Sequence, residues 1–218
     1  MGCDIHLRLE RRLKKDKKVV ILPEEKDENG NVIRKEISRI RSSKVWHNCY
    51  IFDSDNTWGD RCYGMFALLN NVRNQWKNEL KPLEDRGFPI DACNHTKECY
   101  SVKIWDKDEE LPDWAEDNGY VSQKIANEWL EKGYSTKVYL TDIRTGENDE
   151  EYLVSDPDAH SPSWCTTEEM EKCINQIFKD ENGNWNGDYI EWVALLNTMK
   201  GYELSGEYEC RAVFWFDN

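Results

Sequence analysis

Hydrophobic and polar residues alternate along the first strand-like segment of the chain, residues 3–10. A strand here would carry Cys3, Ile5, Leu7 and Leu9 on one face and Asp4, His6, Arg8 and Glu10 on the other. Asp4 and His6 would then lie on the same face, about 7 Å apart along the strand. A carboxylate beside an imidazole can orient it, share a proton with it or hold a metal ion with it. The strand therefore predicts one wall of a polar site.

Residues 11–31 predict a hairpin followed by a second turn. A basic stretch at 11–18 leads into the apolar residues 19–22, which indicates a hairpin with its tip at 15–16. The run Asp-Glu-Asn-Gly-Asn at 27–31 is typical of a tight turn. Because charges at a strand edge oppose further pairing, we expect the basic stretch to be a solvated hairpin edge.

Capping signals divide the rest of the chain into helices and strands. Ser122 is placed to cap a helix that ends at Gly133. Thr166 and Glu169 match a capping box, at the start of a helix that runs to about residue 179. The other expected elements are a helix in the second half of 58–74, a loop at 80–90, strands at 99–104 and 208–216, an acidic loop at 106–119, a hairpin of 134–143 with 151–154 around 145–147, and a helix at 189–199 ended by Gly201.

These elements predict an α+β fold, with one mixed or antiparallel sheet and three to four helices packed on it. No internal repeat and no flexible linker interrupts the pattern. Residues 1–218 are therefore expected to form a single domain. The ten Trp, ten Tyr and six Phe indicate that large rings supply much of its core.

The chain is strongly acidic, and its charge limits the classes of partner. With 29 Lys and Arg against 43 Asp and Glu, the formal net charge is −14. Such a surface repels nucleic-acid phosphates, so general nucleic-acid binding is disfavoured. It does not exclude an anionic small molecule in a local basic pocket, and it permits mimicry of nucleic-acid charge.

Eight cysteines are spread through the chain without a Cys-x-x-Cys pair. The sequence has no apolar signal peptide, and no run approaches the roughly 18 apolar residues of a membrane span. These features favour free, mostly buried thiols in a reducing cytoplasm, without membrane association.

A second polar segment lies directly before the helix predicted to start at Thr166. Residues 156–164 read Asp-Pro-Asp-Ala-His-Ser-Pro-Ser-Trp, and the two prolines predict a stiff loop without regular structure. A helix start carries unpaired amides and a positive partial charge, which suits an anion. The candidate ligand-binding residues here are His160, Ser161, Ser163 and Trp164. The alternative is a structural cap with an Asx-type turn.

Three arginines are candidates to hold an anionic group, because a guanidinium fork matches phosphate and carboxylate. They are Arg61, Arg73 at the end of the helix expected within 58–74, and Arg86, which precedes Gly87. In an acidic protein the alternative for each of them is an internal salt bridge.

Two sets of residues have side chains suited to a metal ion. Asp4, His6 and His160 supply the residue types of a two-histidine-one-carboxylate triad. A second set, suited to zinc, consists of His47, Cys49, Cys93, His95 and Cys99, but its spacing matches no known zinc finger. The sequence has no Walker loop, dinucleotide-binding glycine motif, zinc-protease motif or serine-hydrolase elbow.

Five short motifs occur in order along the chain: Gly-Cys-Asp-Ile-His at 2–6, an aromatic-rich segment ending in Val-Arg at 72–73, Arg-Gly-Phe-Pro at 86–89, His-Ser-Pro-Ser-Trp at 160–164 and Phe-Asp-Asn at 216–218. In these motifs the chain resembles an uncharacterised family of phage and prophage proteins whose members begin with Gly-Cys-Asp-Ile-His. It departs from that family at 90–95, where the family has Asp followed by Ser. Cys93 and His95 lie in this stretch and are therefore particular to this chain, which weakens the zinc hypothesis. Relative to the family, the region around 106–133 resembles an insertion.

The resemblance implies a phage accessory protein that works in the cytoplasm of a bacterial host. Our first hypothesis is a single pocket for a phosphate-bearing small molecule, a nucleotide or nucleotide-derived signal, which is sequestered or hydrolysed. Its catalytic or metal-binding residues would be Asp4, His6 and His160, and its ligand-binding residues Arg61, Arg73, Arg86, Ser161, Ser163 and Trp164. This hypothesis requires Asp4 and His6 to face His160.

The second hypothesis is an acidic interaction protein that inhibits a host nucleic-acid-binding or defence protein by charge mimicry, without catalysis. In that case Asp4 and His6 would be structural. The sequence leaves open the identity of the ligand, the occurrence of catalysis, the presence of a divalent metal and the oligomeric state.

Overall fold

A computed structural model describes residues 3–49, 61–75, 80–105, 111–142 and 147–217. Within these residues it has six helices and twelve strands, in two four-stranded and two two-stranded sheets. The predicted α+β class is confirmed, whereas the prediction of one sheet with three to four helices is wrong. Parts of three predicted elements lie outside the described residues, at 58–60, 106–110 and 143–146.

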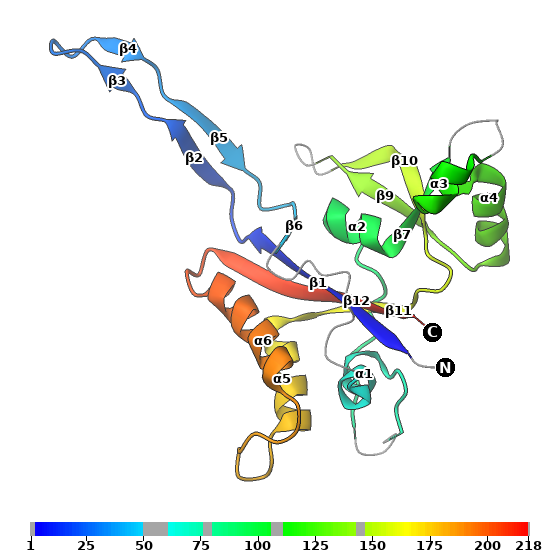
Figure 1. Cartoon of the computed structure of the whole chain (residues 1–218). Coiled ribbons are helices and arrows are strands. Elements are labelled where there is room, and N and C mark those ends of the chain that lie inside the picture. Colours follow the sequence, from blue (N-terminus) through cyan, green and yellow to red (C-terminus); the bar gives the residue numbers. More distant parts are fainter. Residues whose placement is uncertain (1–2, 50–60, 76–79, 106–110, 143–146, 218) are drawn as a thin grey trace.

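A four-stranded antiparallel sheet joins the first and last strands of the chain (Figure 1). Its order is β11–β12–β1–β6, with bounds β1 Asp4–Leu13, β6 His47–Asn48, β11 His160–Thr166 and β12 Tyr208–Asp217. β1 and β12 pair along their whole length, from Asp4 opposite Asp217 to Leu13 opposite Tyr208. The predicted alternation is confirmed on the apolar face of β1, where Ile5 is fully buried.

Three helices pack against the apolar face of this sheet: α1 Tyr63–Asn70, α5 Thr167–Phe178 and α6 Ile190–Glu203. Their buried side chains, including Phe66, Met170 and Trp192, form one hydrophobic cluster with those of β1 and β12. These three side chains are less than 2% exposed, and the cluster that they belong to is the main core of the molecule. No helix among the described residues is long and apolar enough to cross a membrane.

The start of α5 agrees with the prediction from its capping residues, whereas the end of α6 does not. The Thr166 hydroxyl accepts from the Glu169 N–H at 3.3 Å, and the Glu169 carboxylate accepts from the Thr166 N–H at 2.9 Å. The predicted capping box is therefore confirmed. The predicted end of the next helix at Gly201 is wrong, since α6 continues to Glu203.

A second four-stranded sheet is built from residues 101–155. Its order is β8–β7–β10–β9, with bounds β7 Ser101–Trp105, β8 Tyr120–Ser122, β9 Lys137–Thr141 and β10 Asn148–Ser155. The helices of this part of the chain are α2 Asn94–Tyr100, α3 Asp113–Asp117 and α4 Gln123–Lys132. The predicted boundaries of α4 are confirmed: the Ser122 hydroxyl accepts from the Ile125 N–H at 3.3 Å, and Gly133 has a φ of 70°. The predicted antiparallel pairing of the segments before and after 145–147 is also confirmed, since β9 pairs with β10.

The polar segment before α5 is a strand rather than a loop. His160 lies opposite Phe216 and Ser163 opposite Phe214, so Ser161 and Pro162 together occupy a bulge between these two pairs. β11 is the edge strand of its sheet, where a proline can be accommodated because one side of the strand needs no ladder hydrogen bonds. The prediction of a loop at 156–164 is therefore wrong from His160 onward.

Residues 14–44 project from the body as a ribbon, which we call the arm (Figure 1). Its strands are β2 Lys17–Leu22 paired with β5 Ile37–Arg41, and β3 Glu25–Lys26 paired with β4 Val32–Arg34. The turn predicted at 27–31 is confirmed, since the Asp27 carboxylate accepts from the Asn31 N–H at 2.7 Å. The hairpin predicted at 11–22 is wrong, because β2 pairs with β5 and not with β1.

Candidate functional site

His6 and Asp217 form a hydrogen-bonded pair where β1 begins and β12 ends. His6 Nε2 lies 2.9 Å from Asp217 Oδ2. His6 is opposite Trp215 and Asp4 is opposite Asp217, so these side chains project from one face of the sheet. The imidazole stacks on the Trp215 ring, with centroids 5.5 Å apart and an interplanar angle of 8°. Asp217 therefore orients His6, which is the role that we predicted for Asp4.

Asp4 is instead the partner of Arg61, as two contacts show. Arg61 Nε lies 2.8 Å from Asp4 Oδ1, and its NH2 group lies 3.3 Å from Oδ2. The hydrogen bond from Arg61 lowers the pKa of Asp4. Arg61 lies two residues before the start of α1. Its φ of 36° is rare for a residue other than glycine. Asp4, His6 and Arg61 are thus three predicted residues that the fold brings together.

His160 lies on the opposite face of the sheet. It is opposite Phe216, which is itself opposite Ile5 on the core-facing side of β1. The His160 ring stacks on Phe216 with centroids 6.0 Å apart. Neighbouring residues of a strand project from opposite faces, and β12 separates β11 from β1 by two strand spacings, about 10 Å. The prediction that Asp4 and His6 face His160 is not supported by this register.

The core side of the same sheet end holds a second polar group, around Cys3. His160 Nε2 lies 4.0 Å from Cys3 Sγ, and its Nδ1 lies 3.1 Å from Ser161 Oγ. Burial raises the pKa of the Cys3 thiol, against a hydrogen bond with Arg73 that lowers it. Ser161 and Arg73 both have positive φ, 48° and 51°, and the Asn70 side chain donates to the Ser161 carbonyl at 2.8 Å. These contacts hold the end of α1 against β11.

Arg86, Ser163 and Trp164 also come together, as a structural unit. Two nitrogens of Arg86 bind the two carboxylate oxygens of Glu169 at 2.8 and 2.5 Å, and its guanidinium carbon lies 4.5 Å from the Trp164 ring centroid. The Arg86 N–H donates to Ser163 Oγ at 3.2 Å. The hydrogen bond from Arg86 lowers the pKa of Glu169 to about 2. This arrangement is the internal salt bridge that was the alternative to anion binding at Arg86.

The predicted metal triad is not formed. No group of three or more His, Cys, Asp and Glu side chains in the described part of the chain could hold a metal ion. For Asp4, His6 and His160 the physical reason is the register, which directs the two histidines to opposite faces of the sheet.

The zinc candidates separate into local contacts. These are Cys93 with Thr96 (Sγ–Oγ1 3.2 Å), Cys99 with His95 (Sγ–Nε2 3.6 Å) and Cys49 with Cys210. Burial raises the pKa of Cys93 to about 12, so this thiol is protonated near neutral pH. Burial lowers the pKa of His47, since it disfavours the charged imidazolium. Because the described residues contain no group of three metal-ligating side chains, the zinc site is not formed among them either.

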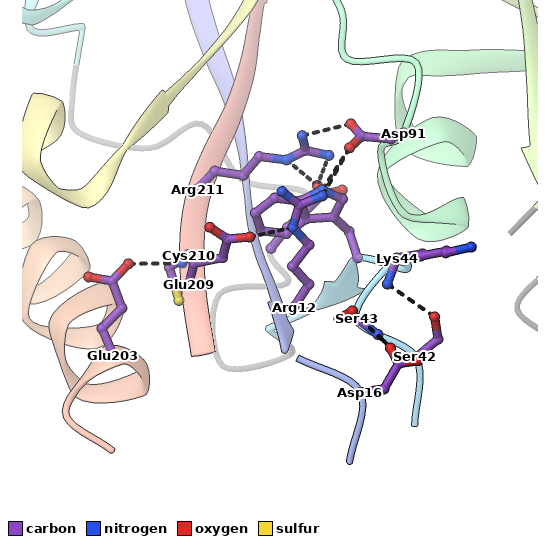
Figure 2. Close-up of polar contacts among 12 residues, drawn as sticks. Arg12, Asp16, Ser42, Ser43, Lys44, Asp91, Glu203, Glu209, Cys210 and Arg211 are labelled. Carbon is purple, nitrogen blue, oxygen red and sulfur yellow. Dashed lines mark hydrogen bonds and ion pairs between the residues drawn. The ribbon is translucent and has the colours of Figure 1, made fainter. Parts of the chain in front are cut away.

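A buried ionic network on the polar face of the sheet was missed by the sequence reasoning. Arg211 Nε lies 2.8 Å from Glu10 Oε2. Arg211 NH1 lies 2.8 Å from Asp91 Oδ1, a contact drawn in Figure 2. Asp91 also accepts from the Trp46 indole N–H at 2.9 Å and lies 3.5 Å from Arg12 NH1. Alternation placed Glu10 on a polar face, but no sequence signal indicated that the loop carrying Asp91 covers that face.

Two tryptophan rings pack against Arg211 of this network, which gives two of the ten Trp residues a structural role. The Arg211 guanidinium carbon lies 4.0 Å from the Trp46 ring centroid and 5.7 Å from that of Trp164. Nearby, Lys97 is 1% exposed, donates to Thr141 Oγ1 at 2.6 Å and has its pKa lowered by burial. Arg211 and Lys97 are thus almost fully buried charged groups between the first sheet and the second, and they act as a polar core, whereas the side chain of Asp91 is 45% exposed.

Two hollows lie away from the predicted site residues. One of about 240 Å³ is bordered by Trp46, Asp91 and Asn94, and one of about 420 Å³ lies over the second sheet beside Tyr120 and Tyr152. None of the nine predicted site residues lines either of them. The convergent polar groups at the end of the first sheet thus lie outside both hollows.

Comparisons with protein-family models, with curated proteins and with solved structures found no match. The resemblance to the phage family stays a prediction. The end of the first sheet, where His6, Asp217, Asp4 and Arg61 come together, is the candidate functional site.

Proposed function

We propose that the protein binds a small phosphate-bearing molecule, a nucleotide or a nucleotide-derived signal, on the face of the first sheet where β1 begins. The observation that carries the proposal is the His6–Asp217 pair, whose side chains are 26% and 39% exposed. Arg61, on Asp4, is 54% exposed. The imidazole of His6 and the guanidinium of Arg61 supply hydrogen-bond donors suited to a phosphate group, and the carboxylates of Asp217 and Asp4 hold these donors in place. Asp217 takes the place of Asp4 as the partner of His6, and His160 is not part of this site.

Sequestration of the ligand is the activity that we propose first. If the ligand is hydrolysed, His6 is the general acid or base and Asp217 fixes its orientation. Following the resemblance, the proposed setting is the cytoplasm of a bacterial host during phage infection, where nucleotide-derived defence signals are candidate ligands.

Thermal unfolding against a panel of nucleotides, cyclic dinucleotides and NAD-derived molecules tests the proposal. A ligand present at one hundred times its Kd stabilises the folded state by about 2.7 kcal/mol. For a chain of this length, that stabilisation raises the unfolding midpoint by roughly 5–10 °C. Each compound that shifts the midpoint is then measured by calorimetry and followed for turnover.

The variants His6→Gln and Asp217→Asn should lose this shift while keeping the midpoint of the unliganded protein within a few degrees. His95→Gln is the matched control, because His95 lies in α2 and contacts Cys99. A ligand-induced shift that persists in both site variants, or the absence of a shift with every compound, would contradict the proposed site.

A second candidate function, binding to a basic host protein, is supported by one observation. Outside the arm, the chain has 19 Lys and Arg against 37 Asp and Glu, a net charge of −18. Charge of this size attracts basic surfaces and competes with nucleic acid for them. Under this function, salt-sensitive binding to a basic nucleic-acid-binding protein survives the His6→Gln change. Loss of that binding in His6→Gln would contradict it.

A further inference from the structure

The arm, residues 14–44, is built as a ribbon without a core. None of its residues is buried. It nevertheless carries half of the fourteen large hydrophobic side chains that are exposed among the described residues: Val20, Ile21, Leu22, Val32, Ile33, Ile37 and Ile40, which are 41% to 65% exposed. A two-stranded ribbon is marginally stable in water, and contiguous exposed apolar side chains mark interaction surfaces. The arm therefore has the properties of an interaction surface.

The strand register gives the arm two different faces. Ile40 is opposite Lys18 and Val20 is opposite Ser38, whereas the intervening pairs place Arg39 and Arg41 on the other face. Val19, opposite Arg39, and Ile37, two residues before it, share the face of the two arginines, so the arm offers aliphatic side chains on both faces. Its two arginines have no ion-pair partner among the described residues.

The charge of the arm is opposite to that of the body. The arm has ten Lys and Arg against six Asp and Glu, a net charge of +4, whereas the remainder of the chain has a net charge of −18. The complement of the arm is therefore a surface that is both acidic and apolar, and the chain itself carries one.

That surface is the hollow of about 420 Å³ over the second sheet, which we call the groove. Its apolar lining includes Ile104, Leu140 and Tyr152. Its charged lining is Glu98, Glu150 and Glu151 against one cation, Lys103, so the groove is acidic on balance. These carboxylates are exposed and form no ion pair within the described residues. The arm extends away from β9 and β10, which border the groove, so it does not reach the groove of its own copy (Figure 1).

We propose that the arm of one copy docks in the groove of a second copy of this chain. The aliphatic side chains of the arm cover the apolar lining of the groove, and Arg39 and Arg41 approach Glu150 and Glu151. Because each copy has both surfaces, two copies related by a twofold axis exchange arms and satisfy both contacts, which closes the assembly as a dimer.

Sedimentation of the full chain at several concentrations and salt levels tests this proposal. The wild-type chain should dimerise, and more weakly as salt rises. Two variants, Arg39→Glu with Arg41→Glu in the arm and Glu150→Arg with Glu151→Arg in the groove, should each raise the dimer Kd by at least about tenfold, or 1.4 kcal/mol. The chain carrying all four changes restores opposite charges across the contact and should recover the dimer. The control is Lys81→Glu with Lys172→Glu, a charge change of the same size on exposed residues of the body.

All the changed residues are exposed, so circular dichroism and the unfolding midpoint should stay near those of the wild-type chain. A wild-type chain that remains monomeric at about 100 µM overturns the proposal. So does a dimer that either double variant leaves intact, or one that the fourfold variant fails to restore. A monomeric chain that binds a labelled oligonucleotide through Arg39 and Arg41 overturns it in favour of nucleic acid as the occupant.

Discussion

Arg211 and Glu10 face each other across β12 and β1 with almost no access to solvent. Arg211 Nε lies 2.8 Å from Glu10 Oε2, and the two side chains are 3% and 0% exposed. The other Glu10 oxygen accepts from the Cys93 N–H at 2.7 Å. Removing two charges from water is costly, and only a full set of partners offsets that cost. The pair therefore makes the junction of the two sheets sensitive to the loss of either charge.

Replacing Arg211 by Met leaves the buried Glu10 carboxylate with the Cys93 N–H but without its guanidinium partner. We expect the free energy of unfolding to fall by about 3–5 kcal/mol, the usual loss when one partner of a buried pair is removed. The double variant Glu10→Leu with Arg211→Met should lose less than the sum of the two single variants, because no charge is then left unpaired. Urea unfolding followed by tryptophan fluorescence measures both.

The exposed pair of Lys172 with Glu168 is the control for that experiment. Its side chains are 67% and 78% exposed, so Lys172→Met should change stability by less than about 1 kcal/mol. If Arg211→Met costs no more than Lys172→Met, the buried pair does not stabilise the junction.

The Arg86–Glu169 pair predicts a dependence of stability on pH. The pKa of Glu169 is about 2 in the folded protein, below its ordinary value of 4.5, mainly because Arg86 binds the carboxylate. A depressed pKa stabilises the folded state above the unfolded pKa, and this contribution disappears as the pH falls through the folded pKa. The stability difference between the wild type and Arg86→Met should therefore be full at pH 7 and shrink between about pH 5 and 2.

Acid titration of urea-unfolding midpoints for the two proteins measures this difference. Its size should not exceed about 3 kcal/mol, since each pKa unit corresponds to 1.36 kcal/mol and the pair is partly open to solvent. A difference that is constant from pH 7 to pH 3 would show that Arg86 stabilises the fold by packing on Trp164 and not through Glu169.

Local signals predicted the elements whose ends depend on nearby residues. The capping box of Thr166 and Glu169 located α5, and Ser122 with Gly133 located α4, because caps are satisfied by groups three or four residues away. β11 and β2 were mispredicted because their pairing is not local. Pro162 is accommodated by a bulge at an edge, and β2 has its partner beyond a turn at 27–31.

The candidate site was predicted in part for the same reason. Alternation placed Asp4 and His6 correctly on one face of β1. The partner of His6 is Asp217, at the other end of the chain, and no local pattern joins these two residues. His160 was expected in a loop facing Asp4 and His6; its orientation depends instead on the register of β11 against β12, which the sequence does not encode locally.

Two glycines should respond to alanine with opposite signs. Gly201 lies inside α6, and no atom of another element lies within 4 Å of the position that an alanine Cβ would take, so Gly201→Ala should stabilise the protein by about 0.5–1 kcal/mol. Gly133 ends α4 with a φ of 70°, so Gly133→Ala should destabilise it by about 1 kcal/mol. Thermal unfolding of both variants distinguishes these effects, and a destabilised Gly201→Ala would place the end of the helix at Gly201, as the sequence alone suggested.

The eight free cysteines should differ sharply in reactivity, because six are buried and only Cys62 and Cys99 are partly exposed. Burial raises the pKa of Cys93 and of Cys173 to about 12, which leaves almost no thiolate near pH 8. Iodoacetamide should therefore label Cys99 and, more slowly, Cys62 in the native protein, and all eight thiols in denaturant. Peptide mass spectrometry over time gives the rate at each site. Native labelling of Cys93 as fast as that of Cys99 would mean that the cover over the buried ionic network opens readily, since Cys93 donates its backbone N–H to Glu10 within that network.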